Sequence, residues 1–145
     1  MKKYPLPKQE GFTLIEVLVV VVIVAILAAI SVPIYIQYVE GARASDAQAT
    51  IGAIYNASKM YYQDRSEDPT DVQILEDLGY LDIDQSTEKQ WTFTIVGSNP
   101  ITQIIGTSTS EMKGGAGREV TYNVDNGLFE GYGLPSEEGE SERGQ

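Results

Sequence analysis

The longest uncharged stretch of the sequence, from Val17 to Val39, sets the tightest limit on the fold. Apart from Ser31, Pro33, Gln37 and two tyrosines, every residue in it is aliphatic. A helix of about 20 apolar residues crosses the roughly 30 Å hydrocarbon core of a bilayer. We therefore expect this run to be a membrane-spanning helix.

One charged residue, Glu16, stands directly before this run. A carboxylate beside the apolar core of a membrane costs about 2.5–3.5 kcal/mol on insertion scales. No Lys or Arg lies one helical turn further on, at positions 19 and 20, to pair with it. We therefore expect the partner of Glu16 to come from outside its own helix.

Residues 1–11 have the character of a targeting segment, because they are basic and have no apolar core of their own. An ordinary secretory signal has its apolar region before the cleavage site and loses it. A cut after Gly11 would instead leave the apolar run on the mature chain. An uncleaved signal anchor is the alternative. In either case the positive-inside rule keeps the leader lysines in the cytoplasm and predicts export of the C-terminal part.

The overall charge excludes several kinds of partner. The 145 residues include 21 acidic and 10 basic ones, a formal net charge of −11. The first eleven residues hold three lysines and one glutamate, so residues 12–145 carry 20 acidic and 7 basic residues, or −13. Nucleic acid and anionic lipid both require clustered Lys and Arg. We therefore expect the exported part to bind neither nucleic acid nor anionic lipid. We expect its exterior to be soluble and self-repelling.

The absence of cysteine and histidine excludes most catalytic sites, since no thiol nucleophile or imidazole base can form. The glycine-rich stretch 114–117 lacks the Lys-Ser/Thr pair of a phosphate-binding loop. The acidic stretches Asp64–Asp71 and Asp82–Asp84 offer oxygen ligands for Ca²⁺, but neither matches an EF-hand loop, and we favour solvated loops. We predict no enzymatic activity, no cofactor and no metal site.

After Gly41 the apolar pattern narrows to one stripe, formed by Ala47, Ile51, Ile54, Ser58 and Tyr61. Spacings of three and four residues place them on one face of an amphipathic helix. We therefore predict a single helix from about Phe12 to Gln63. Its first half is apolar nearly all round, and its second half has one face to bury.

The remaining sequence predicts a short helix and four strands. Thr70 and Gln73 form a capping-box pattern before a helix at about 71–78, which Gly79 closes. Alternating patterns predict strands at 91–96, 101–105, 120–124 and 128–132. Asp125-Asn126-Gly127 predicts a tight hairpin turn between the last two strands. The Ser/Thr/Gly-rich stretch 107–117 predicts a mobile connection, and residues from Pro135 on predict a disordered acidic tail.

The stretch Gly11-Phe12-Thr13-Leu14-Ile15-Glu16-Val17-Leu18 resembles the class III signal of type IV pilins and pseudopilins. The likeness combines a short basic leader, a glycine at the cleavage site, a phenylalanine after it and a glutamate at the fifth mature position. It extends to about Ala47. It implies that prepilin peptidase cuts between Gly11 and Phe12 and then methylates the new amine of Phe12.

The same resemblance implies how subunits assemble. The amine of Phe12 is cationic at neutral pH, so it can pair with Glu16 of a neighbouring subunit. Pro33 is expected to kink the helix, and in the family a proline at this place marks a segment that can unravel in filaments. Many pilins close a C-terminal loop with a disulfide, and this chain departs from that pattern because it has no cysteine.

The predicted fold class is α+β: a long N-terminal transmembrane and spine helix, packed by its C-terminal half on a small antiparallel sheet of about four strands. The predicted parts are a cleaved leader at 1–11, a transmembrane or filament-core segment at 12–40, a globular head at 41–134 and an acidic disordered tail at 135–145.

The predicted function is that of a structural subunit of a type IV pilus-like filament. The expected partners are further copies of the chain in a helical homo-oligomer, prepilin peptidase, an inner-membrane assembly platform and its ATPase. Before assembly the chain would span the bacterial inner membrane once, with its N-terminus in the cytoplasm, and afterwards it would form an extracellular or periplasmic filament. Two alternatives stay open: a major pseudopilin of a type II secretion system, and a single-pass anchored binding module.

Overall fold

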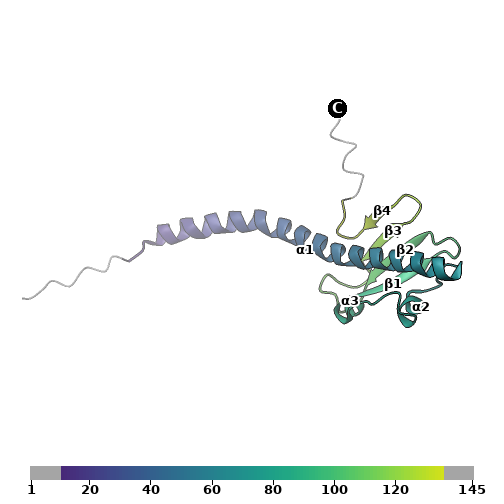
Figure 1. The fold of residues 1–145 in the computed structure, drawn as a ribbon. Helices are drawn as coiled ribbons and strands as arrows, with labels where there is room; N and C mark the ends of the chain where they lie inside the picture. The colour runs from purple at the N-terminus through teal and green to yellow at the C-terminus, as the bar shows by residue number, and fades with distance from the viewer. Residues whose placement is uncertain (1–10, 136–145) are drawn as a thin grey trace, which may run out of the picture. The chain divides into compact units, whose positions relative to one another are not determined.

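The computed structural model describes residues 11–135, which form two compact units, one ending at Ile36 and one starting at Gln37. The predictions for leader residues 1–10 and tail residues 136–145 lie outside this range. The elements, shown in Figure 1, are α1 (Leu14–Arg65), α2 (Val72–Asp77), α3 (Gln85–Gln90), β1 (Trp91–Val96), β2 (Gln103–Ser108), β3 (Glu119–Asn123) and β4 (Leu128–Gly131).

The long helix is confirmed, and it runs two residues later at each end than the pattern predicted. Its buried face in the second unit holds every residue of the predicted stripe, since Ala47, Ile51, Ile54, Ser58 and Tyr61 are all buried. Ala44 and Ala57 extend this face. Small residues let the helix backbone approach the sheet closely, while the isoleucines fill the space between.

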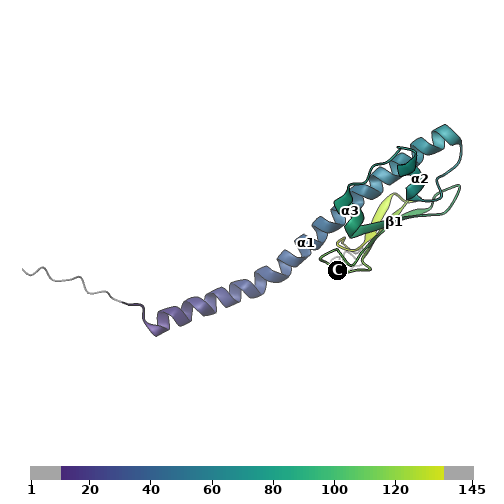
Figure 2. The same cartoon turned by 90° about the horizontal axis from the view of Figure 1, so that it is seen from below.

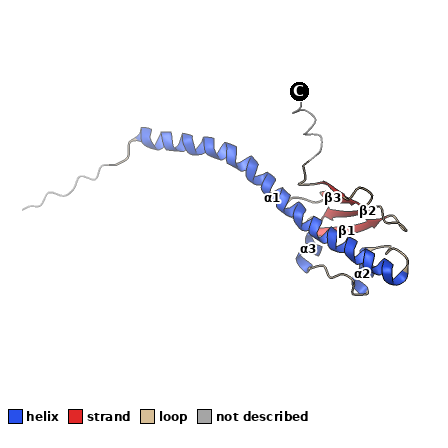
Figure 3. Ribbon diagram, turned by 45° about the horizontal axis from the view of Figure 1, so that its top comes forward, coloured by secondary structure: helices blue, strands red, loops and turns tan. Residues whose placement is uncertain are grey.

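The four strands form an antiparallel meander in the order β1-β2-β3-β4, next to the second half of α1 (Figures 2 and 3). Trp91 and Ile95 of β1 are buried, whereas Thr92 and Thr94 between them are exposed. This is the period-two alternation of a sheet with one covered face. The fold is therefore α+β with a four-stranded antiparallel sheet, as predicted.

Helix and sheet share one core, in which Ile51, Ile54, Leu75, Ile104 and Val120 are fully buried. A methyl group at Gly106 of β2 would lie 3.5 Å from Cδ1 of Ile51 and 3.0 Å from Cε1 of Phe93. The glycine therefore leaves room for these two side chains to meet the strand. A small sheet alone is marginally stable, and α1 supplies the other half of its core.

The predicted cap of α2 is wrong by one residue. Oδ1 of Asp71 accepts a hydrogen bond from the backbone N–H of Ile74 at 3.0 Å, so Asp71 is the N-cap and not Thr70. The Gln73 side chain does not complete a capping box but donates to Asp77 at 3.1 Å. Thr and Asp are both good caps, so the sequence Thr-Asp did not decide between them. Gly79 has a φ of +78° and ends the helix as predicted.

Helix α3 was not predicted, because a loop was expected around Asp82–Asp84. None of its six residues is buried or large and apolar, so it has no hydrophobic period. It depends instead on Asp84, whose carboxylate accepts hydrogen bonds from the backbone N–H groups of Ser86 at 3.0 Å and Thr87 at 3.1 Å. An N-cap of this kind was the one available signal.

The second predicted strand, 101–105, is wrong in its bounds, and the predicted mobile connection begins too early. Strand β2 continues to Ser108. The hydroxyl of Ser108 donates to the carbonyl of Gly115 at 2.7 Å and accepts from the N–H of Arg118 at 2.8 Å. Met112 is buried inside the loop. These contacts join residues that are distant in the sequence, so composition alone did not reveal the order.

The turn between β3 and β4 is longer than the predicted tight hairpin. Asn123 pairs with Leu128, which leaves four residues in the turn, and Gly127 supplies the positive φ of 71°. The side chain of Asn123 accepts a hydrogen bond from the N–H of Asp125 at 3.0 Å. The N–H of Val124 donates to the carbonyl of Thr102 at 2.9 Å. This long-range bond draws Val124 out of the β3–β4 ladder and lengthens the turn.

Candidate functional site

The start of α1 carries the residues predicted to be processed. Gly11, Phe12 and Thr13 precede the helix and are exposed, and Phe12 is 88% exposed. A Cβ added at Gly11 would meet no atom within 4 Å. The Gly11–Phe12 peptide bond therefore lies in accessible, non-helical chain, which is the form that a peptidase can bind.

Glu16 has hydrogen-bond partners within its own chain, and the expectation that a charged partner comes from outside its helix stays a prediction. Oε2 of Glu16 accepts from the backbone N–H of Thr13 at 2.7 Å and from the Thr13 hydroxyl at 2.8 Å. In return, Oγ1 of Thr13 accepts from the backbone N–H of Glu16 at 3.3 Å. This reciprocal pattern is a capping box. The motif Thr-Leu-Ile-Glu could have revealed it, and we missed that signal.

The capping box does not neutralise the charge of Glu16. Thr13 supplies neutral donors, and the sequence contains no Lys or Arg from Gly11 to Ala42. A carboxylate held by neutral donors keeps its negative charge and can still attract a cation from another molecule. The geometry therefore orients the carboxylate at the first turn of the helix and leaves its charge available.

The first part of α1 presents an apolar surface on all sides. Every residue from Phe12 to Tyr38 is exposed. Among the described helices, α1 is the one that is long and apolar enough to cross a membrane. Such a surface has to be covered, because large exposed apolar patches mark contacts with lipid or with other proteins.

Helix α1 is continuous through Pro33. Two residues before it, the hydroxyl of Ser31 donates to the carbonyl of Leu27 at 2.8 Å. A proline removes one backbone donor from the helix and crowds the preceding turn. A kink at Pro33, and a role for it in the filament, stay predictions.

The acidic loops of the head use part of their carboxylates structurally. Asp68 accepts from the N–H of Ile101 at 3.2 Å, and Asp64 accepts from the hydroxyl of Tyr80 at 2.7 Å, which raises the pKa of Tyr80. Asp71 and Asp84 cap helices. Within residues 11–135 no group of three or more acidic side chains is placed to hold a metal ion.

The cap of α3 should titrate at unusually low pH. Hydrogen bonds from the side chains of Ser86 and Thr87, together with backbone N–H groups, lower the pKa of Asp84 from its usual 3.8 to about 2. The folded pKa lies below the unfolded one, so the stabilisation of α3 is complete above about pH 4 and is lost as the pH falls towards about 2. An NMR titration of the Thr87 amide should show this midpoint.

Asparagine at position 84 keeps a capping oxygen but cannot titrate in this range. We therefore expect Asp84→Asn to abolish the Thr87 transition while α3 persists. A transition near pH 4 in the unsubstituted chain would contradict the assignment.

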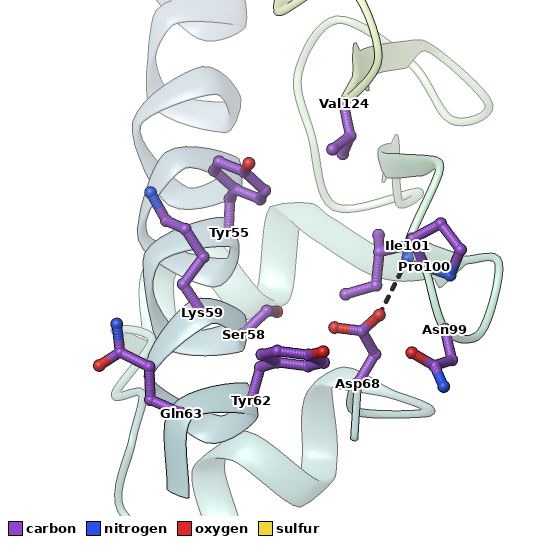
Figure 4. Close-up of a pocket in the computed structure, with 10 residues that line it drawn as sticks. All are labelled: Tyr55, Ser58, Lys59, Tyr62, Gln63, Asp68, Asn99, Pro100, Ile101 and Val124. Atoms are coloured by element: carbon purple, nitrogen blue, oxygen red, sulfur yellow. Dashed lines mark hydrogen bonds between the residues drawn. The ribbon is translucent and has the colours of Figure 1, made fainter. Parts of the chain in front are cut away.

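A groove of about 380 Å³ on the head is drawn in Figure 4. Tyr55, Lys59 and Tyr62 of α1 form one side, and Asp68 and the segment 99–101 form the other. Nζ of Lys59 lies 4.5 Å from the ring centroid of Tyr55. The groove combines aromatic rings with amide, carboxylate and ammonium groups, so it can accommodate a polar ligand that has a flat apolar face.

Comparison with known proteins gives a family match for the N-terminal segment. Residues 6–32 match the model described as the prokaryotic N-terminal methylation motif. The chain is 39% identical over 59 residues to the type IV major pilin protein PilA of Myxococcus xanthus, an alignment that covers 41% of this chain and 27% of that protein. It is 43% identical over 63 residues to the fimbrial protein EcpC of Eikenella corrodens, covering 43% of this chain and 41% of that protein.

A third relative belongs to a secretion system. The chain is 49% identical over 78 residues to the type II secretion system core protein G of Vibrio cholerae, covering 54% of this chain and 52% of that protein. The chain thus spans about half or less of the length of these three relatives. The segment that matches the methylation-motif model, residues 6–32, contains the predicted cleavage site and Glu16.

Proposed function

Since this chain carries the N-terminal segment and the α+β fold of the type IV pilin and pseudopilin family, we propose that it is a structural subunit of a type IV pilus-like filament. In this proposal prepilin peptidase cuts between Gly11 and Phe12 and methylates the amine of Phe12. Before assembly the mature subunit spans the membrane once, and it then polymerises through α1.

One observation carries this proposal above the others. The first part of α1 is apolar on all sides and exposed, and it begins with an oriented, charged carboxylate. Lipid covers such a surface before assembly, and neighbouring helices cover it afterwards. Glu16 then meets the cationic amine of Phe12 from another subunit, and two charges that are each costly in an apolar setting become a pair.

Processing at Gly11 provides the direct test. Exported protein should begin at Phe12 and carry one added methyl group, as intact-mass measurement can show. Gly11→Val should block the cut. Because a Cβ at Gly11 meets no atom of the chain within 4 Å, the block would act at the peptidase and not through the fold.

Gly52→Ala is the matched control, since its new Cβ also meets no atom within 4 Å, and it should be processed normally. A mass that includes residues 1–11 in the unsubstituted chain would overturn the proposal in favour of an uncleaved anchor.

The pseudopilin is the competing function within the family, favoured by the similarity to core protein G. Both functions use the same leader, Glu16 and long helix. Electron microscopy of cells separates them. Extended surface filaments that contain this chain support the pilin, whereas loss of exoprotein secretion on deletion, without surface fibres, supports the pseudopilin.

The groove beside Tyr62 favours the third function, a membrane-anchored binding module. Such a module would need no polymerisation. Isolation of the processed chain from membranes only as a monomer, in cells that assemble no filament from it, would support this function and overturn the other two.

A further inference from the structure

A basic hollow lies on the head, beside the first turns of the part of α1 that belongs to the head. Its volume is about 420 Å³, and it is lined by Arg43 of α1, Ser86, Lys89 and Gln90 of α3, and Glu111 and Lys113 of the β2–β3 loop. Three of the six basic residues between positions 11 and 135 therefore share one hollow with a single carboxylate. Its lining has a net charge of +2 on a strongly acidic protein.

Backbone contacts hold the two sides of the basic hollow together. The carbonyl of Gln90 accepts from the N–H of Thr109 at 2.9 Å, and the carbonyl of Lys89 accepts from the Thr109 hydroxyl. These bonds join the end of α3 to the loop that carries Lys113. A methyl group at Gly114 would lie 3.0 Å from Nη1 of Arg43, so the glycine leaves room for the guanidinium group. The cations are thus placed by the fold.

The opposite charge gathers at the far end of the head. The segment from Asp64 to Asp77, which we call the acidic end, contains six acidic residues and one basic residue, a net charge of −5. Glu67, Asp71 and Asp77 are exposed. Burial, and then repulsion from Glu88, raises the pKa of Glu76. Negative charge is therefore in excess in this segment and is open to a cationic partner.

The two charged regions lie at opposite ends of the head part of α1. In Figures 1 and 2, α3 lies beside the start of this part and α2 beside its end. From Arg43 to Asp64 the helix rises by about 30 Å at about 1.5 Å per residue. The basic hollow therefore lies near the start of this part of the helix, and the acidic end lies near its C-terminal end.

We propose that the basic hollow of one subunit receives the acidic end of a second copy of this chain. This inference rests on the proposed filament function. Contact between two different surfaces of identical copies is heterologous, and it generates an open helical assembly when the rotation does not close. The contact also offsets part of the repulsion between subunits that each carry a charge of −13.

Disulfide cross-linking tests the contact cleanly because the chain has no cysteine. We expect the double variant Lys113→Cys/Glu67→Cys, oxidised in isolated filaments, to give a ladder of dimers, trimers and longer species on a non-reducing gel. Each single variant should give none. Filaments without a ladder would overturn the contact and leave the filament function intact, whereas absence of filaments from the unsubstituted chain would overturn the function itself.

Charge exchange provides a second measurement that does not depend on cysteine placement. Lys89→Glu/Lys113→Glu should lower filament yield about tenfold, and combination with Glu67→Lys/Asp77→Lys on the same chain should restore most of it. Lys59→Glu/Arg118→Glu makes the same charge change outside both the basic hollow and the acidic end and should leave the yield within about twofold. A combined variant whose filament yield is no higher than that of Lys89→Glu/Lys113→Glu would contradict the contact between the basic hollow and the acidic end.

The chain's own C-terminal segment is the competing occupant, since residues 136–145 contain four glutamates. A chain that ends at Pro135 should keep the Lys113→Cys/Glu67→Cys ladder. A ladder that is absent from the full chain and forms only in filaments of the truncated chain would assign the hollow to that segment and overturn the contact between copies.

Discussion

Replacement of Glu16 by glutamine should leave export and processing intact and should reduce filament assembly about a hundredfold or more. Removal of one partner of a buried ion pair typically costs about 3–5 kcal/mol, and about 1.4 kcal/mol corresponds to a factor of ten. The glutamine side chain can still accept hydrogen bonds from Thr13 in the capping box, but it carries no charge. The variant thus removes the attraction to Phe12 and preserves the helix start.

Thr13→Val is the matched control, because it removes the hydroxyl that donates to Glu16 at 2.8 Å and keeps the carboxylate. We expect it to lose about 1 kcal/mol of capping and to assemble at a yield near that of the unsubstituted chain. Filaments are sheared, pelleted and quantified against the membrane pool, whose mass should start at methylated Phe12. Normal assembly of Glu16→Gln together with failure of Thr13→Val would assign the residue to capping and refute the charge pair.

Gly133→Ala should destabilise the head by about 3 kcal/mol or more, from a backbone strain of about 1–2 kcal/mol and overpacking of about 1–3 kcal/mol. Gly133 has a φ of +70°, and a methyl group there would lie 2.5 Å from the carbonyl oxygen of Glu40 and 2.8 Å from Cβ of Ala44. Both atoms belong to α1, so the segment after β4 can only move away from the helix.

Gly127→Ala separates the two contributions. Its φ of +71° is nearly the same, but a methyl group there would lie 4.0 Å from its nearest neighbour, the Tyr122 hydroxyl. We therefore expect a loss of about 1–2 kcal/mol, from strain alone. Urea unfolding of the full chain in detergent can be followed by the fluorescence of Trp91, the one tryptophan, which is buried. Equal losses of unfolding free energy for Gly133→Ala and Gly127→Ala would show that the close contact with α1 adds nothing to the destabilisation.

Much of the fold could be predicted because its signals are local and periodic. The apolar run and the stripe from Ala47 to Tyr61 predicted one helix, and the alternation in Trp91–Val96 predicted a strand with one buried face. The capping box at Thr13 and Glu16 is equally local, since the two residues stand three positions apart in the sequence. Helix α3 has no large apolar residue to set a period, so the cap at Asp84 was its one local signal.

The candidate sites also divide into one that a local sequence signal predicts and one that only the folded structure shows. The cleavage motif and Glu16 are close together in the sequence, and the match to the methylation-motif model covers both. The basic hollow could not be predicted, because Arg43, Lys89 and Lys113 are separated by more than twenty residues in each interval. Only the packing of α3 and the β2–β3 loop beside α1 brings these cations together.

The sequence by itself determined that this chain has an apolar N-terminal helix, one carboxylate at its start and a small helix-and-sheet head. Hydrophobic periodicity and uncompensated charge are properties of neighbouring residues, so they can be seen before folding. The tertiary structure decided which way the carboxylate of Glu16 is held, where the strands end and how the head's charges separate. Those features depend on hydrogen bonds and contacts between residues that are brought together by folding, and no local pattern encodes them.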